Sequence, residues 1–349
     1  MLTIIAFVFV FSILVFFHEF GHFISAKISG VKVHKFAFGM GPKIFGFYKN
    51  ETEYLICLIP IGGFVKMAGE MGQENTGTTT EKVPENQRFD KKPLRVRALI
   101  VALGPLMNIF TAIIIFSLIF FITGIPLITN NIATIVENGP ADQAGIIPGD
   151  KIIAINSVKI DNPKEIAEII NKNSDNILNI TLDRNGKSIN IPVIPRYDEN
   201  YNKFRIGIEL DISIKKINIF SAFSKGLITT LNVIKLIFSN TIEMITGKVP
   251  VEIAGPLGIA QMTGEAVKLG FLNLLYFTAI LSIFIGLFNL LPIPALDGGH
   301  IIILIIEKLR GKPLEAEKMN LIYLIGISII MIIFIFATYK DISRILFNK

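Results

Sequence analysis

Residues 1–28 read MLTIIAFVFVFSILVFFHEFGHFISAKI, and they indicate the class of the whole protein. Met1–Phe17 carry no charge, and the apolar character continues through His18 and Glu19 to about Ile24. A helix needs about 20 apolar residues to cross a bilayer. The segment has no basic n-region and no clear small-x-small cleavage site, so we expect it to be retained as a transmembrane helix.

Three more apolar stretches follow, at residues 98–129, 269–296 and 319–339. Of the 349 residues, 51% are hydrophobic, which is too many for an ordinary soluble protein of this length. Irregular backbone facing lipid is costly, so these stretches should be helices. The sequence therefore predicts a polytopic α-helical membrane protein with about four transmembrane helices.

The segment Phe220–Ile245 has apolar residues at helical spacing, interrupted by Lys225, Lys235 and Glu243. This pattern favours a helix lying along the membrane surface. A fifth span is the alternative.

The first polar region, residues 27–97, begins with the pattern of a β-hairpin. Lys43–Tyr48 and Tyr54–Ile59 are strand-like runs joined by the polar residues Lys49–Glu53. Gly62 and Gly63 then precede a further short strand-like run, Phe64–Lys66. We expect a hairpin associated with the membrane on its cytoplasmic side.

The second polar region has the pattern of a compact α+β domain. Strands are predicted at 132–136 and 151–155, a helix after Pro163, and a hairpin around Arg184–Lys187. We place this domain at residues 130–195. The other expected parts are an N-terminal membrane core at 1–129, a connecting region at 196–268 and a C-terminal membrane core at 269–349.

The positions of Lys and Arg predict the orientation, because short loops rich in these residues stay in the cytoplasm. The basic loops lie after the first helix, before the second, and between the last two, at Lys27, Lys32, Lys35, Lys91, Lys92, Arg95, Arg97, Lys308, Arg310, Lys312 and Lys318. The domain at 130–195 and both termini are then external. Lys340, Arg344 and Lys349 argue against an external C-terminus.

Charge and cysteine content exclude some classes. The net charge is +6, but the basic residues are spread out as in loops beside a membrane, so no nucleic-acid partner is expected. The single cysteine, Cys57, excludes an internal disulfide and a cysteine-based zinc cluster.

The sequence His18-Glu19-Phe20-Gly21-His22 matches H-E-x-x-H. Residues four apart share one face of a helix, so both imidazoles can bind one zinc ion. Glu19 stands beside them and can take a proton from a zinc-bound water. Ionisable groups are costly within a membrane segment, which favours function over a simple interface marker.

A catalytic zinc usually has three protein ligands, so a third must come from elsewhere. The intramembrane candidate is Asp297, in a run with helix-breaking prolines and flexible glycines, NLLPIPALDGGH, at 289–300. Two alternatives stay open: Asp297 caps a helix starting near His300, or His300 is itself the ligand.

These motifs together resemble the site-2 protease family of intramembrane metalloproteases, in its bacterial regulator of sigma-E protease branch. H-E-x-x-H lies in the first helix and Leu296-Asp297-Gly298 in a late one. The runs 104–108 (GPLMN) and 255–260 (GPLGIA) are similar to further family signatures. The segments 139–145 and 149–153 are similar to a bacterial PDZ domain. There is room for one such domain, whereas some members carry two.

The resemblance implies roles for individual residues. His18, His22 and Asp297 would bind Zn²⁺, and Glu19 would be the catalytic base. Asn108 and Asn289 would bind substrate backbone or an oxyanion, or else only join helices by hydrogen bonds. Gly62, Gly63, Phe64 and Val65 would pair with an extended substrate, or else form only a structural hairpin.

The implied function is zinc-assisted hydrolysis of peptide bonds within or near transmembrane segments, in the inner membrane of a bacterium. The implied substrates are anti-sigma factors or remnant signal peptides, with membrane lipid and PDZ-bound peptides as further partners. The active site would open toward the cytoplasm. A metal transporter and a silent PDZ scaffold are the alternatives from other classes.

Overall fold

The computed structural model of the protein describes residues 1–70, 83–172, 176–199, 201–250, 254–312 and 314–347. The chain forms two compact units. Unit 1 combines Met1–Phe121 with Asn218–Lys349, and unit 2 is Ile122–Ile217. The predicted membrane helices lie in unit 1. The predicted domain at 130–195 lies within unit 2, which extends beyond it at both ends.

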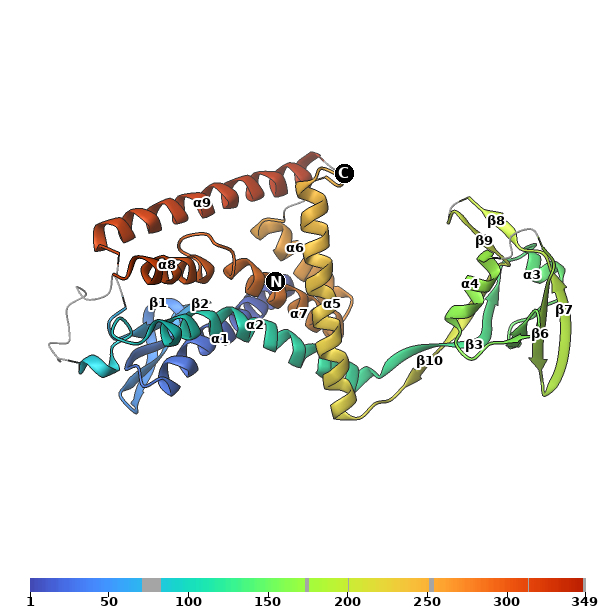
Figure 1. Ribbon diagram of the computed structural model, residues 1–349, viewed down its shortest axis with the longest axis horizontal. Coiled ribbons are helices and arrows are strands. Elements are labelled where there is room, and N and C mark those ends of the chain that lie inside the picture. The colour runs from blue at the N-terminus through green and yellow to red at the C-terminus, as the bar shows by residue number, and fades with distance from the viewer. Residues whose placement is uncertain (71–82, 173–175, 200, 251–253, 313, 348–349) are drawn as a thin grey trace. The chain divides into compact units, whose positions relative to one another are not determined.

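Unit 1 is mainly helical (Figure 1). Apart from a short 3-10 turn at Glu85–Gln87, its helices are α1 (Leu2–Ile28), α2 (Leu94–Thr123), α5 (Ile219–Ile245), α6 (Pro256–Lys268), α7 (Phe271–Asn289), α8 (Asp297–Arg310) and α9 (Ala316–Phe347). In the described part of the chain, five helices are long and apolar enough to cross a membrane: α1, α2, α5, α7 and α9. Four of these match the predicted spans, and α5 is the segment predicted to lie along the surface.

The predicted second span, 98–129, is shorter at its C-terminal end than expected. Helix α2 stops at Thr123, and Gly124 adopts a left-handed conformation with φ of 80°. Glycine tolerates this conformation and commonly ends helices in this way. The apolar residues that follow belong instead to a β-strand.

Helix α5 packs closely on α2. The side chain of Asn218 accepts a hydrogen bond from the Ser221 amide and caps the helix. Its buried residues Ala222, Gly226 and Thr230 recur every four positions, so they form one face. In Figure 1, α5 runs across the direction of α2 and α9.

Apolar clusters hold the helices of unit 1 together. Val10 and Leu14 of α1 pack with Leu274 and Leu281 of α7 and with residues of α6. A second cluster joins α2, α5 and α7 around Phe116. Asp341 of α9 is buried and accepts a hydrogen bond of 2.7 Å from the Gly258 amide, so α9 satisfies the N-terminus of α6.

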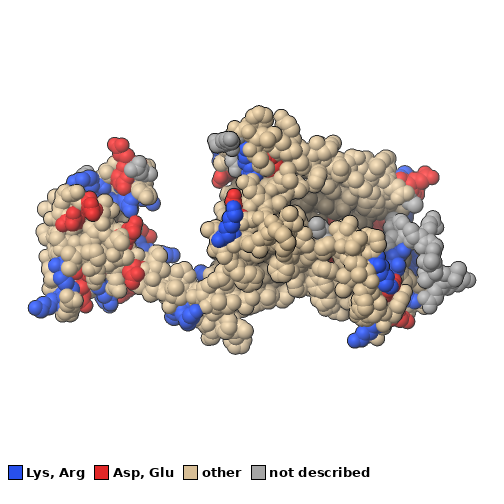
Figure 2. Space-filling model, turned by 180° about the vertical axis from the view of Figure 1, so that it is seen from behind, with Lys and Arg blue, Asp and Glu red and all other residues tan. Residues whose placement is uncertain are grey.

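The surface of unit 1 suits a membrane environment. Figure 2 shows a broad face with few Lys, Arg, Asp or Glu side chains. Helix α9 alone exposes many large apolar residues, including Leu324, Ile332 and Ile335. Soluble monomers rarely expose so much contiguous apolar surface.

A two-stranded antiparallel sheet, β1 (Val33–Lys49) and β2 (Thr52–Met67), lies beside α1. Both strands are longer than the runs predicted from the sequence. The tight turn at Asn50 and Glu51, both with positive φ, replaces the predicted loop Lys49–Glu53. Cys57 is buried in this sheet and is a free thiol.

Unit 2 is built on a six-stranded sheet with the path β10-β3-β4-β6-β7, on which β5 pairs β4. Its elements are β3 (Ile125–Ile135), α3 (Pro140–Gln143), β4 (Lys151–Ile155), β5 (Val158–Lys159), α4 (Lys164–Lys172), β6 (Leu178–Arg184), β7 (Lys187–Val193), β8 (Arg196–Asp198), β9 (Lys203–Arg205) and β10 (Ile208–Lys215). Strands β8 and β9 form a separate hairpin. The core is almost entirely Ile, Leu and Val.

A two-stranded ribbon forms the ends of unit 2. Strands β3 and β10 are antiparallel, with Ile125 opposite Lys215 and Ile128 opposite Ile212. The chain enters the unit along β3 and leaves it along β10. The two ends of unit 2 are therefore neighbours in space.

Candidate metal centre

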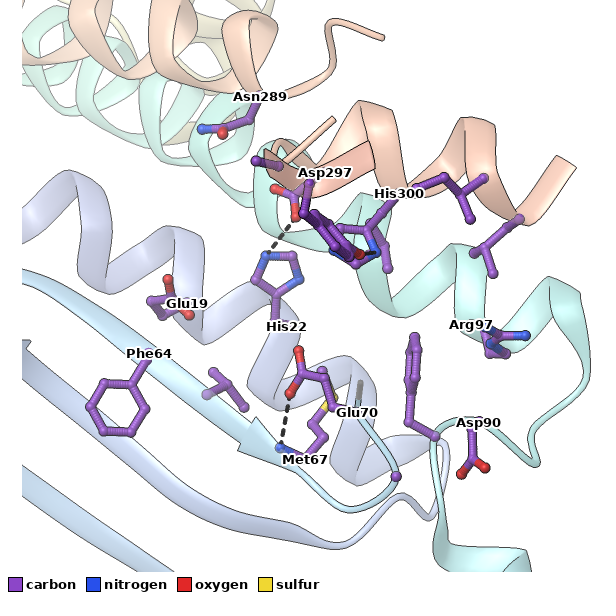
Figure 3. Close-up of a pocket in the computed structure, with 18 of the residues that line it drawn as sticks. Glu19, His22, Phe64, Met67, Glu70, Asp90, Arg97, Asn289, Asp297 and His300 are labelled. Carbon is purple, nitrogen blue, oxygen red and sulfur yellow. Dashed lines mark hydrogen bonds and ion pairs between the residues drawn. The ribbon is translucent and has the colours of Figure 1, made fainter. Parts of the chain in front are cut away.

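Two histidines and one carboxylate converge where α1 passes the start of α8. His18 and His22 are one turn apart on α1, and their Nε2 atoms are 3.3 Å apart. The Asp297 carboxylate lies 3.1 Å from His18 Nε2 through Oδ2 and 3.5 Å from His22 Nε2 through Oδ1. Figure 3 shows His22 and Asp297 pointing toward each other.

This donor set fits a zinc ion. One ligand atom from each of the three residues lies within 4.8 Å of the others, and no second group of this kind occurs among the described residues. Two imidazoles and one carboxylate are a normal catalytic zinc set that leaves a position for water. Each Asp297 carboxylate oxygen lies within 3.5 Å of an imidazole Nε2, so one metal ion could bind all three groups.

The second nitrogen of His22 fixes the orientation of its ring. His22 Nδ1 lies 2.9 Å from the Ile100 carbonyl oxygen of α2. Since a carbonyl can only accept, Nδ1 carries a proton, and Nε2 is the nitrogen available to a metal. An outer hydrogen bond of this kind is the usual support of a metal-binding histidine.

Two glycines let α1 and α2 approach closely enough for this contact. A Cβ at Gly21 would lie 2.2 Å from the Leu103 carbonyl oxygen, and one at Gly104 would lie 2.2 Å from His22 Nε2. Real Cβ atoms essentially never come that close. Gly104 therefore provides the space that the His22 ring occupies.

The Glu19 side chain extends from α1 toward β2. A Cβ on Gly63 would be 3.2 Å from Glu19 Cγ, and the Val65 amide lies near the Glu19 carboxylate. Figure 3 shows Glu19 near Phe64, on the strand side of the helix. The backbone of β2 thus holds the carboxylate beside the two histidines.

A cavity of about 510 Å³ opens onto the centre. Its described lining includes the three candidate ligands, Glu19 and five further polar residues: Glu70, Asp90, Arg97, Asn289 and His300. Phe64 and Val65 also line it, whereas Asn108 is absent from this lining. Of the two asparagines singled out in the sequence, Asn289 alone is placed to meet a substrate there.

His300 lies in the cavity wall but outside the cluster of three. Its ring nitrogens lie 2.8 and 3.0 Å from the Tyr323 hydroxyl of α9. Asp297 is the first residue of α8, yet its carboxylate faces the histidines. The geometry therefore favours Asp297 over His300 as the third ligand.

Other lining residues gave no signal in the sequence. Burial raises the pKa of the Glu70 carboxyl, although the Met67 amide donates a hydrogen bond to it at 3.2 Å. Arg97 forms a largely buried ion pair with Glu307, at 3.0 Å. Neither the Glu70–Met67 contact nor the Arg97–Glu307 pair could be recognised as a motif in the sequence. Arg97 and Glu307 lie on different helices, and Glu70 lies just beyond the end of β2.

Comparisons with known proteins agree with a metal site of this kind. The profile of Peptidase family M50 matches residues 6–333. The regulator of sigma-W protease RasP of Bacillus subtilis is 32% identical, over 98% of this chain and 99% of its own. A putative zinc metalloprotease of Clostridium acetobutylicum is 34% identical over 95% of each chain. The probable protease eep of Enterococcus faecalis is 33% identical over 99% of this chain and all of its own.

Among solved structures, the PDZ domain of an SdrC-like protein from Listeria innocua matches 24% of this chain and 92% of its own. The TM-score is 0.22 and the identity 20%. This match is too weak to assign a fold to unit 2.

Proposed function

Because this chain belongs to peptidase family M50, the family of the site-2 proteases, we propose that it cleaves membrane-protein substrates at a zinc ion held by His18, His22 and Asp297. The bond cleaved lies within or near a transmembrane segment. The observation that carries the proposal is the convergence of three ligand atoms from α1 and α8. They meet beside a carboxylate, Glu19, and a cavity of about 510 Å³.

The residues of the chain divide the chemistry between them. His18, His22 and Asp297 would hold the zinc ion, which would supply Lewis-acid activation of a water molecule and of the peptide carbonyl. Glu19 accepts a proton from the attacking water and returns it to the amide nitrogen that leaves. The Val65 amide, which lies near the Glu19 carboxylate, would orient it for both transfers.

The substrate must be unwound before it is cut, because a helix hides its peptide bonds in its own hydrogen bonds. In the described part of the chain, β2 has only β1 as a strand partner, and an extended peptide would pair with its other edge where α1 leaves room. Gly62, Gly63 and Phe64 would form this edge near the cavity. The Asn289 side chain would donate to the peptide carbonyl.

The orientation in the membrane follows the basic loops. We place the centre toward the cytoplasm and unit 2 outside, as expected for a multi-pass protein of a bacterial cell membrane. Helix α5 crosses the direction of α2 and α9, which suits a helix at the membrane surface. The protein then has four spans, α1, α2, α7 and α9, and both of its termini lie outside.

Unit 2 would be a PDZ-like regulatory domain. Its antiparallel sheet and its helices α3 and α4 agree with the α+β domain expected from the sequence. It would bind peptides or restrict access by large substrates. It contains none of the three candidate ligands.

Substrates would be short membrane proteins already trimmed by another protease. One relative is named as a regulator of a sigma factor, which suggests anti-sigma factors for this chain. Remnant signal peptides fit the same site. A metal transporter is disfavoured, because the described ligand residues gather at one centre and form no path. An intact Glu19 disfavours a silent scaffold.

The test separates metal binding from catalysis. Purified His18→Ala and Asp297→Ala should lose both zinc and cleavage of a model transmembrane substrate. Glu19→Gln should keep about one zinc per chain while turnover falls by roughly 10²–10⁴-fold. Wild-type turnover by Glu19→Gln, or full zinc retention by Asp297→Ala, would contradict the proposed roles.

A further inference from the structure

Asn108 is a buried polar residue of α2 whose side chain meets His18. Its side chain is completely inaccessible to solvent, and its Nδ2 lies 3.4 Å from His18 Nδ1. Its Oδ1 is buried and has no hydrogen-bond donor among the described residues. Buried amide oxygens nearly always have a donor, so this one needs an explanation.

The requirements of His18 supply that explanation. His18 Nε2 faces His22 Nε2 at 3.3 Å and Asp297 Oδ2 at 3.1 Å, so this is the nitrogen offered to the metal. A neutral imidazole has one N–H, so His18 must then carry its proton on Nδ1. That Nδ1–H needs an acceptor, and the amide nitrogen of Asn108 cannot accept.

The two ends of an amide have the same shape, so turning the Asn108 amide by 180° leaves the packing unchanged. The turn places Oδ1 opposite His18 Nδ1–H. In this orientation Asn108 Oδ1 accepts a hydrogen bond from His18 Nδ1–H, so both atoms have a partner. His18 then has the arrangement that His22 already has with the Ile100 carbonyl.

We infer that Asn108 is a positioning residue for the metal centre. Its side-chain oxygen accepts a hydrogen bond from His18 Nδ1–H and keeps His18 in the tautomer that offers Nε2 to zinc. The inference rests on the proposed function, since it assigns no role to Asn108 without a metal. It replaces the substrate-binding or oxyanion role considered for Asn108 from the sequence.

The packing around Asn108 agrees with a role away from substrate. Helix α7 covers it: the Ser282 hydroxyl donates to the Asn108 backbone carbonyl at 2.7 Å. A Cβ on Gly286 would lie only 3.3 Å from Asn108 Cβ. The described cavity lining includes Asn289 and omits Asn108, so a peptide in the cavity does not reach this amide.

The experiment measures zinc affinity of the purified full chain in detergent, by competition with a chromophoric chelator. Asn108→Leu removes the acceptor at nearly constant volume and should weaken zinc binding roughly 10–100-fold. Asn108→Asp keeps an acceptor oxygen in place and should stay within about threefold of the wild type. Leu106→Ala, on the exposed face of the same helix, is the matched control and should leave the affinity unchanged.

Each other outcome is decisive. If Asn108→Leu binds zinc as tightly as the wild type, or if Asp and Leu weaken it equally, the inference is wrong. Unchanged affinity with lower turnover would instead assign Asn108 to transition-state binding. Should Asn108→Leu fail to fold by circular dichroism, Asn108→Ala gives the same comparison with Asp. If His18→Ala also keeps zinc, the proposed function fails first, which the Asn108 variants alone would not show.

Discussion

The contact between His22 and Gly104 is the tightest steric constraint at the centre. A methyl group at Gly104 would overlap the imidazole, and the ring cannot move without losing either Asp297 or the Ile100 carbonyl. Neither H-E-x-x-H nor the run GPLMN at 104–108 predicts this contact, because the two motifs lie on different helices. A glycine before a proline within an apolar helix was the available signal.

We expect Gly104→Ala to lower zinc affinity by at least about tenfold, since it displaces a ligand ring. Leu106→Ala is the control, because Leu106 lies on the same helix with an exposed side chain. Zinc content after dialysis of both purified variants measures the effect. Equal zinc retention in the two variants would show that the ring can occupy another position.

The ion pair of Asp150 and Arg184 makes unit 2 sensitive to acid. Arg184 donates two hydrogen bonds of 2.7 Å to the buried Asp150 carboxylate. The Arg184 guanidinium holds the pKa of this carboxyl below its usual value. The stabilisation is therefore complete above the ordinary carboxyl pKa and is lost as the pH falls through the lower, folded-state value.

At pH 7, Asp150→Asn should lower the stability of unit 2 by about 1–3 kcal/mol. Hydrogen exchange of β4 and β6 amides, corrected for intrinsic rates, measures this difference. In acid the wild type loses the same contribution, so the difference between the two proteins should shrink. A difference that stays constant from pH 7 to the acid limit would mean that the pair does not stabilise unit 2.

At the scale of elements, β1 and β2 show where sequence patterns fall short. The predicted run began only at Lys43, yet β1 starts at Val33 and passes through Gly39, Gly41 and Pro42 before it ends at Lys49. The pairing with β2 shifts register repeatedly from Val33 to Phe45, and Phe36, Ala37 and Phe38 each pair with two residues of β2. Such bulges absorb residues that a regular strand would exclude, and no local pattern announces them. By contrast, the strand 151–155 was predicted with its final bounds, because turn residues flank it on both sides.

The position of the Val65 amide near the Glu19 carboxylate suggests what a proline at Val65 should do. Proline removes that donor, so Val65→Pro should lower turnover by disturbing the catalytic carboxylate, while zinc stays bound. Val65→Ala keeps the donor but loses part of a buried side chain, so it should mainly cost stability. Steady-state kinetics at matched zinc content separates the two. Equal turnover of both variants would show that this amide does not orient Glu19.

At the scale of the whole molecule, the sequence predicted the metal ligands and the catalytic base, but not the groups that hold them in place. His18, Glu19 and His22 stand out because their spacing is local to one helix. Asp297 was proposed from its motif, and its meeting with the histidines depends on the fold of the entire unit. The Ile100 carbonyl could not be predicted at all, because every residue has one.

Because β3 and β10 are paired, most of unit 2 could be deleted and the two strands joined directly. Thr129 and Asp211 face each other on the ribbon, with the Thr129 hydroxyl donating to the Asp211 carbonyl. Replacing residues 130–210 by Asn-Gly would close β3 and β10 as a short hairpin. Zinc content and cleavage of a small model substrate should persist, whereas large substrates should be cut faster than by the intact chain. Loss of all cleavage in a folded, zinc-loaded excision variant would make unit 2 part of the catalytic machinery.

The order in which the ribosome makes the chain bears on the metal centre. His18 and His22 emerge with the first helix, but Asp297 follows only near the end of the chain. Asp341, which holds the start of α6 against α9, emerges later still. A growing chain therefore carries two of the three ligands and an incomplete helix bundle. We therefore expect the growing chain to be inactive as a protease until Asp297 has been synthesised, because only then can all three ligands meet.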